Sequence, residues 1–172
     1  MRKKTLPSKT LGSINNYDVY DQRIGKTTTS GTDRFVYGQN QNIALEFDGS
    51  GALTNRYLHG NSIDDVVADE ANGSVGWTLT DNLGTVRDVV DSTGASENHL
   101  IYDSFGNLTS ETNPSFDTQF SFTGREFDEE TGNYDYRNRQ LRPSSGRFIE
   151  EDPIGFNAGD PNLYRYVKNS PA

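Results

Sequence analysis

The sequence predicts a mainly β fold built from consecutive antiparallel hairpins. An Asp with a Gly three residues later recurs behind an aromatic, Val or Thr residue, at Asp48–Gly51, Asp81–Gly84, Asp91–Gly94 and Asp103–Gly106. Segments that alternate apolar and polar residues lie between these motifs, and Gly, Thr and Tyr are frequent throughout. Short alternating segments joined by Asp–Gly turns are typical of β-hairpins.

The chemistry of the D-x-x-G motif explains why it forms a turn. Asp is favoured at the first position of a type I turn and Gly at the fourth. The Asp carboxylate accepts hydrogen bonds from backbone N–H groups inside the turn, and Gly tolerates a positive φ as the chain leaves it. We therefore interpret Asp103 as a turn-former. A degenerate copy at Tyr17–Asp21 has Asp in place of Gly, and Asp128–Gly132 has one extra residue.

The hairpin repeats are expected over residues 1–114. Strands are expected around the turns in four stretches, at residues 51–60, 76–80, 84–91 and 98–103. The stretch Ser62–Ala71 has a Ser cap, but its apolar spacing suits a two-turn helix or a strand equally well. Composition changes near Asn113 and Pro114, so residues 115–172, which are richer in Arg, Tyr, Asp and Pro, form a second segment.

Composition excludes several classes of protein. The net charge of −9 disfavours nucleic-acid binding and docking on anionic membranes. The absence of Cys excludes disulfides, thiolate metal sites and a Cys nucleophile. No stretch approaches the roughly 20 apolar residues of a membrane span. The basic first residues are not followed by an apolar region, so no signal peptide is recognised. We expect no cofactor.

Other polar clusters are weak candidates for binding sites. The acidic residues Asp128, Glu129 and Glu130 lack the alternating ligands of a calcium loop, so a solvated acidic turn is expected there. His59 and His99 are 40 residues apart, and no third ligand gives them zinc spacing. We expect His59 to hydrogen-bond to backbone at the end of a strand. Tyr side chains could stack on sugars, but Tyr in strands usually packs across strands.

The last third of the chain carries several motifs in a specific order: "FTGREFDEETG" from Phe122, "YRNR" from Tyr136, "GRFIEEDPIG" from Gly146 and "NLYRYVKNSP" from Asn162. With these motifs and the preceding repeats, residues 17–172 resemble RHS, or YD-repeat, proteins. Residues 115–172 resemble the RHS-repeat-associated core segment of that family. Relatives in the family include insecticidal toxin-complex subunits, bacterial contact-dependent toxins and teneurins.

The resemblance implies a scaffold function. RHS proteins are large secreted or surface-associated polypeptides whose repeats coil into a β-sheet shell around a C-terminal toxin or effector, and the core segment plugs the shell. The partners implied are the rest of the shell, the enclosed effector and a secretion machinery. The alternative is a cell-surface module that uses Tyr-rich hairpins to bind carbohydrate or protein. Because few hairpins precede the core, we expect marginal stability and aggregation through unpaired edges.

The resemblance also implies an aspartic autoprotease in the core segment. Asp152 matches the catalytic Asp of the family, and Arg147 lies near enough in sequence to tune its charge. Aspartic proteolysis needs two carboxyls that share a proton. In the family the second Asp and the cleavage site follow an N-x-P motif, whereas this sequence stops at Ala172, so we expect no self-cleavage by the chain as given. The alternative is a structural turn at Asp152, with Pro153 fixing φ and Ile154 packing inward.

One stretch departs from the family pattern. The family has two aromatic residues and D-P after its Y-R-A-R run. This chain has different residues at those places, namely Asn138, Gln140, Leu141 and Arg142. The loss of aromatic side chains predicts looser packing of the core segment.

Overall fold

The computed structural model of the chain describes residues 13–20, 22–116 and 118–171. Ten strands form one sheet in chain order: β1 (Ile14–Tyr17), β2 (Arg23–Thr27), β3 (Thr32–Tyr37), β4 (Ile43–Asp48), β5 (Leu53–His59), β6 (Val66–Ala71), β7 (Ser74–Thr80), β8 (Val86–Val90), β9 (Ser96–Tyr102) and β10 (Leu108–Glu111). Four shorter strands form a second sheet: β11 (Glu126–Asp128), β12 (Asn133–Asp135), β13 (Gln140–Arg142) and β14 (Arg147–Phe148).

Both sheets are antiparallel meanders in which each strand pairs with the next one along the chain. The only helical elements among the described residues are short 3₁₀ turns, such as η1 (Gln39–Gln41). None of the described helices is long and apolar enough to cross a membrane. The predicted mainly β class is therefore confirmed. The ambiguous stretch Ser62–Ala71 contains strand β6 and no helix.

The four D-x-x-G motifs form the predicted turns. In each, the Gly N–H donates to the Asp carbonyl oxygen at 2.9 to 3.1 Å. One carboxylate oxygen of the Asp accepts from the backbone N–H groups two and four residues later. The φ of each Gly lies between 77° and 90°. Asp18 makes the same two carboxylate contacts, whereas Asp21 at the Gly position lies outside the described residues.

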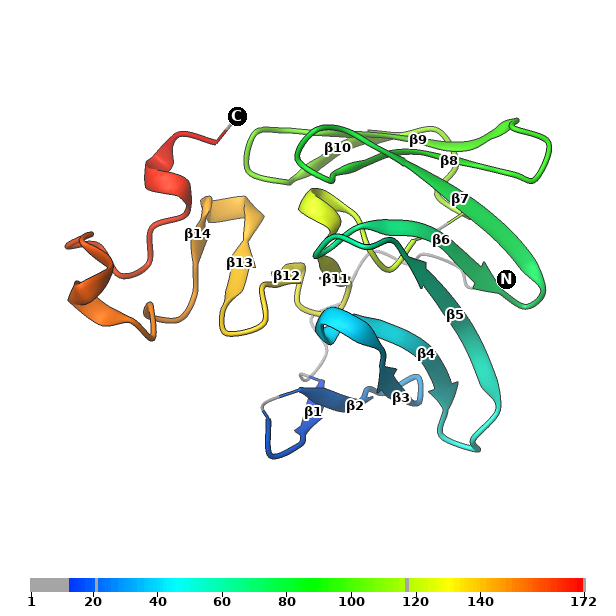
Figure 1. Ribbon diagram of the computed structural model, residues 1–172, viewed down its shortest axis with the longest axis horizontal. Coiled ribbons are helices and arrows are strands. Elements are labelled where there is room, and N and C mark those ends of the chain that lie inside the picture. The colour runs from blue at the N-terminus through cyan, green and yellow to red at the C-terminus, as the bar shows by residue number, and fades with distance from the viewer. Residues whose placement is uncertain (1–12, 21, 117, 172) are drawn as a thin grey trace.

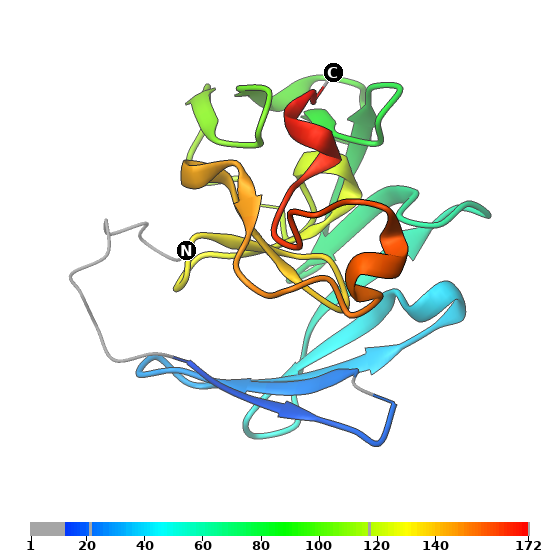
Figure 2. The same ribbon diagram turned by 90° about the vertical axis from the view of Figure 1, so that its left-hand side faces the viewer.

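The ten-stranded sheet is strongly curved, and the second sheet lies on its concave side. Figure 1 shows β1–β3 below, β5–β7 at the right and β8–β10 above, with β11–β14 inside this arc. The view turned by 90° shows the same arrangement, with the yellow and orange strands between the blue and green ends of the large sheet (Figure 2). The C-terminal segment thus fills the concavity that the repeats create.

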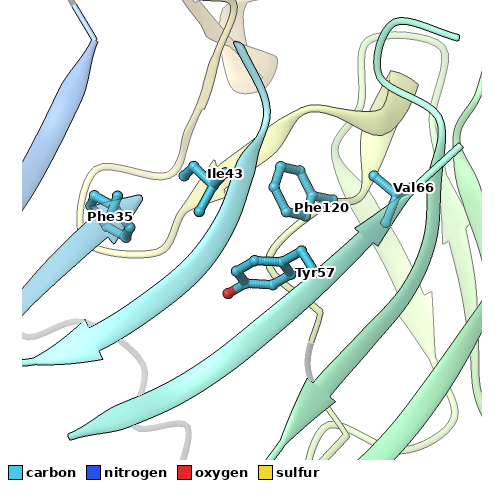
Figure 3. Close-up of a cluster of buried hydrophobic side chains, with 5 residues drawn as sticks. All are labelled: Phe35, Ile43, Tyr57, Val66 and Phe120. Atoms are coloured by element: carbon cyan, nitrogen blue, oxygen red, sulfur yellow. The ribbon is translucent and has the colours of Figure 1, made fainter. Parts of the chain in front are cut away.

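An apolar cluster joins the two parts of the chain. Phe120, from the segment after β10, packs among four buried residues of the large sheet (Figure 3): Phe35, Ile43, Tyr57 and Val66. The Phe120 ring meets the Tyr57 ring edge to face, with centroids 5.1 Å apart. Because this side chain covers the interior faces of β3–β6, that part of the large sheet has a closed core only when the C-terminal segment is in place.

A second, aromatic cluster forms the core of the C-terminal segment. Its buried members are Phe122, Tyr134, Leu141, Phe148 and Tyr166. Leu141 has no exposed surface and pairs across strands with both Tyr134 and Phe148. The expectation of looser packing at Leu141 is therefore wrong. The branched aliphatic side chain of Leu141 is fully buried because the four aromatic rings of this cluster pack around it.

Candidate functional site

The contact between the C-terminal segment and the concave sheet begins with a buried group of charges. Strand β2 contributes Arg23 and Lys26, and the β11 region contributes Glu126, Asp128 and Glu130. Lys26 Nζ lies 3.0 Å from Asp128 Oδ1 and also pairs with Glu130. Arg23 pairs with Glu126, and its Nη1 lies 3.7 Å from Asp128 Oδ2. All of these residues except Glu130 are at least nine-tenths buried.

The burial of Asp128 corrects one expectation from the sequence. Asp128 is 5% exposed, so the acidic turn at residues 128–130 is not simply solvated. Burial raises the pKa of Asp128, but the charge and hydrogen bond of Lys26 outweigh it and hold the pKa below its usual value. No group of three or more His, Cys, Asp or Glu side chains able to hold a metal occurs in the described part of the chain.

A second contact lies at the β5–β6 loop. Asp64 Oδ2 lies 2.8 Å from Arg125 Nη2, and Asp64 Oδ1 lies 2.7 Å from Arg137 Nη2. Gly124 packs so closely that a Cβ there would lie 2.2 Å from the Asp64 carbonyl oxygen. The Asp64 carboxylate of the large sheet thus pairs with two guanidinium groups of the C-terminal segment. The sequence did not single out Asp64, because nothing local distinguishes it from Asp65.

A third contact lies at the β9–β10 turn, which is the turn of Asp103. The Tyr134 hydroxyl donates to the Gly106 carbonyl oxygen at 2.9 Å. Asn107 Nδ2 donates to the Pro143 carbonyl oxygen at 3.0 Å. Contacts at β2, at the β5–β6 loop and at the β9–β10 turn therefore tie the C-terminal segment to both ends and the middle of the large sheet.

Asp152, the candidate catalytic residue, forms a turn that shares two of the three hydrogen bonds of the repeat turns. Its Oδ1 accepts from the Ile154 N–H at 2.9 Å, and the Gly155 N–H donates to its carbonyl oxygen at 2.8 Å. The structural turn considered for this position is therefore present. Ile154 is 63% exposed, so the expectation that it packs inward is wrong.

The structure brings Arg139, and not Arg147, to Asp152. Arg139 Nη1 lies 3.1 Å from Asp152 Oδ2, and its guanidinium lies over the Phe148 ring at 3.7 Å from the centroid. Arg147 lies in β14 and forms no ion pair with Asp152. Asp128 faces Arg23 and Lys26 and does not pair with the groups around Asp152. The turn and the Arg139 guanidinium, which stacks on Phe148, thus hold the single carboxyl of Asp152 in place.

His59 lies where the sequence predicted, at the end of β5. Its Nε2 lies 2.8 Å from the Ile43 carbonyl oxygen, and its ring meets the Phe120 ring edge to face. The backbone hydrogen bond expected for His59 is confirmed. His99 lies in β9 and pairs with Asp88 at 2.8 Å.

Comparison with known proteins identifies relatives of the chain. Residues 13–172 match the model of the teneurin YD-shell family. The tRNA3(Ser)-specific nuclease WapA of Bacillus spizizenii is 30% identical over 161 residues, which are 90% of this chain and 7% of that protein. The toxin protein Tse5 of Pseudomonas aeruginosa is 35% identical over 92 residues, 54% of this chain and 7% of Tse5. The chain spans less than a tenth of the length of either relative.

Solved structures share the fold. The crystal structure of TcdB2-TccC3 superposes with a TM-score of 0.56 at 19% identity, over 93% of this chain and 10% of that chain. A Tc holotoxin pore of Photorhabdus luminescens gives a TM-score of 0.58 at 18% identity, over 94% of this chain and 10% of that chain. The curved sheet with a segment on its concave side therefore corresponds to a small portion of a much longer chain in these proteins.

Proposed function

The chain belongs to the teneurin YD-shell family, and from this premise we propose that it forms one end of a larger β shell that encloses a toxin or effector polypeptide. One observation carries the proposal: the C-terminal segment occupies the concave side of the large sheet and is tied to it at β2, at the β5–β6 loop and at the β9–β10 turn. A curved sheet whose hollow side is filled in this way can close a shell. The toxin and nuclease names of its relatives support a protein that is secreted or displayed on a cell surface.

Within this function, each part of the chain has a separate role. Residues 1–114 supply hairpin repeats of the wall, and residues 115–172 supply the core segment that fills it. The partners are the remaining repeats and the enclosed polypeptide. Asp152 provides one carboxyl of an aspartic autoprotease in the longer protein, and Arg147 acts on it only if the segment rearranges, because Arg139 is its partner in the structure.

The shell function is tested on the full reading frame that encodes the chain. Cryo-electron microscopy is expected to reveal a closed shell with these residues at one end, and the polypeptide that follows residue 172 is expected to resist added protease. The variant Phe120→Asp removes the contact with Tyr57 and should expose that polypeptide. Phe156→Asp is the matched control, because Phe156 is 74% exposed. An open sheet, or equal protease sensitivity in all three proteins, would contradict the function.

The role of Asp152 is tested separately in the same longer protein. Intact-mass measurement is expected to reveal cleavage after the core segment, and Asp152→Asn should abolish it. Asp103→Asn is the matched control, because Asp103, like Asp152, accepts from the backbone N–H two residues later but lies at another site. Loss of cleavage in both variants would mean that cleavage depends on the fold of the chain and would not assign the Asp152 carboxyl a catalytic role.

A further inference from the structure

A Lys nitrogen and an Asp carboxyl meet in the buried group of charges between the large sheet and the C-terminal segment. Lys26 is 8% exposed and Asp128 is 5% exposed, and Lys26 Nζ lies 3.0 Å from Asp128 Oδ1. The carboxyl carbon is one bond from Oδ1, so the nitrogen lies close to the near-attack range of about 3–3.5 Å. An amine and a carboxyl held at this separation are the two groups that condense to an amide. The shell function uses this contact only as an ion pair.

The residue type at position 26 distinguishes this contact from an ordinary buried ion pair. Lys is almost never fully buried unless it is paired, and buried ion pairs favour Arg, whose guanidinium keeps its charge. Arg23 supplies such a pair at the same place, with Glu126. Lys26 instead brings a nitrogen that becomes a nucleophile when it loses a proton. The only other Lys among the described residues is Lys168, which is exposed.

The Glu130 side chain contacts both members of the pair. Its carboxylate pairs with Lys26 Nζ. Burial raises the pKa of Asp128, the charge and hydrogen bond of Lys26 lower it, and a hydrogen bond with the Glu130 side chain lowers it further. The Glu130 side chain is 39% exposed, so it also connects the buried pair to solvent. A carboxylate in this place can carry a proton from the nitrogen to the Asp128 carboxyl, which is general acid–base catalysis.

The backbone that follows Asp128 stabilises one of its two carboxyl oxygens. The N–H groups of Glu130 and Thr131 donate to Asp128 Oδ1 at 3.0 and 3.2 Å. Attack of an amine on the carboxyl carbon moves an electron pair onto one oxygen, and N–H donors aimed at that oxygen lower the barrier. Asp128 Oδ2 has no hydrogen-bond partner, and Arg23 Nη1 lies 3.7 Å from it. Oδ1 is thus the oxygen that is held, and Oδ2 is the oxygen that can leave.

We propose that Lys26 and Asp128 condense to an intramolecular amide bond, with Glu130 as the proton carrier. Glu130 carries one proton from the Lys26 ammonium to Asp128 Oδ2, which gives a neutral amine and a carboxylic acid. The Nζ lone pair then forms a bond to Cγ, and the C=O electrons move onto Oδ1. When the C=O bond re-forms, the Cγ–Oδ2 bond breaks, and Oδ2 leaves as water after taking a second Nζ proton through Glu130. One ammonium and one carboxylate thus give one amide and one water, with no change in oxidation state.

The ion pair is the starting state, and it limits the rate of the reaction. The lowered pKa of Asp128 means that the neutral amine and acid form the minor population. Burial acts in the opposite direction, because removal from water disfavours both charges. We therefore expect the bond to form slowly after folding, over hours to days. The product replaces two buried charges by a neutral amide, and it joins β2 covalently to the end of β11, so the C-terminal segment stays in the hollow of the large sheet.

Intact-mass spectrometry of the purified whole chain tests the proposal without reference to the shell function. The folded chain, held at neutral pH, should lose the mass of one water within a week, whereas a chain held in concentrated urea should not. Tryptic digestion should yield one branched peptide that joins the segment of Lys26 to the segment of Asp128, with no cleavage after Lys26. Absence of the mass loss and of the branched peptide, in a chain with a folded circular dichroism spectrum, overturns the proposal.

Three variants assign the roles of the residues. Lys26→Arg keeps the positive charge but removes the nucleophile, so the mass loss should disappear. Glu130→Gln keeps a polar side chain that carries no proton, and it should slow the reaction about 100-fold. Lys168→Arg is the matched control at an exposed Lys and should react at the unaltered rate.

Two outcomes of the variants contradict the proposal. A mass loss that persists in Lys26→Arg comes from ring closure elsewhere, for example between Asp48 and Gly49, and overturns the amide bond. An unaltered rate in Glu130→Gln overturns the proton transfer through Glu130. The branched peptide in the unaltered chain decides the question even if Lys26→Arg does not fold.

Discussion

Each D-x-x-G turn places one carboxylate oxygen against two backbone N–H groups, and these contacts change the acid equilibrium of the Asp. The Thr93 hydroxyl and then the backbone N–H of Ala95 lower the pKa of Asp91. Burial raises the pKa of Asp81, but the backbone N–H of Leu83 and the Arg87 side chain outweigh it and lower the pKa overall. Hydrogen bonds to the charged form are thus a repeated source of folded-state stability.

This chemistry predicts loss of stability in acid. A pKa lowered from 3.8 in the folded chain means that the unfolded chain binds more protons in that range. The contribution is therefore fully present well above pH 3.8 and is lost as the pH falls below it. Urea unfolding between pH 7 and pH 2 should reveal a steep fall below pH 4. Asp81→Asn should make that fall shallower, and Glu97→Gln, at a half-buried position of β9 outside the turns, should change it less.

Asp64 is the single residue whose loss should do most damage to the contact between sheet and C-terminal segment. Asp64→Asn keeps a side chain that tolerates its φ of 61° but removes the charge that faces Arg125 and Arg137. We expect a loss of about 2 kcal/mol in the free energy of unfolding, because two partly buried cations lose their partner. Chemical denaturation measures this loss in the free energy of unfolding. Arg56→Gln, in an exposed pair with Glu70, should cost less than about 0.5 kcal/mol.

At the scale of elements, the hairpins could be predicted from sequence and the contacts between them could not. The Asp–Gly spacing indicates where β4, β8 and β9 end, because a type I turn followed by a left-handed Gly is encoded within four residues. The burial of Asp128 depends on Lys26, which is 102 residues away in the chain. No local pattern identifies such a partner.

The same distinction separates the predicted and observed surroundings of Asp152. Its turn follows from the local Asp152–Gly155 motif, which has the spacing of the repeats. The cation that pairs with Asp152 does not follow from a local motif. Proximity in sequence suggested Arg147, whereas the β12–β13 connection places Arg139 beside Asp152.

Two turn glycines give a matched test of how the C-terminal segment packs on a hairpin. Gly94 and Gly106 have φ of 86° and 90°, so Ala at either position carries the same backbone cost of about 1–2 kcal/mol. A Cβ at Gly94 has nothing within 4 Å, whereas one at Gly106 would lie 2.6 Å from Phe122. Gly106→Ala should therefore lower the free energy of unfolding by at least about 1 kcal/mol more than Gly94→Ala. Equal losses in urea denaturation would mean that Phe122 moves aside.

For the whole molecule, the edges of the large sheet determine its behaviour in solution. Among the described residues, β1 pairs with β2 alone and β10 with β9 alone, so each presents unpaired backbone groups on one side. We predict concentration-dependent association of the isolated chain through these edges. Ile14→Lys adds a charge on β1, where Ile14 is 65% exposed, and should reduce association in sedimentation velocity. Ile154→Lys, at a comparably exposed residue in a turn, should not.

The contact between β2 and the β11 region also determines the order in which the chain folds. Neighbouring hairpins need only short loops to close and can form early, whereas the Lys26–Asp128 contact must close a loop of 102 residues. During synthesis, the repeats leave the ribosome before Phe120 exists to cover Phe35 and Tyr57. The nascent sheet therefore passes through an interval in which its apolar hollow is open to chaperones or to other chains. That interval ends when residues 115–172 emerge.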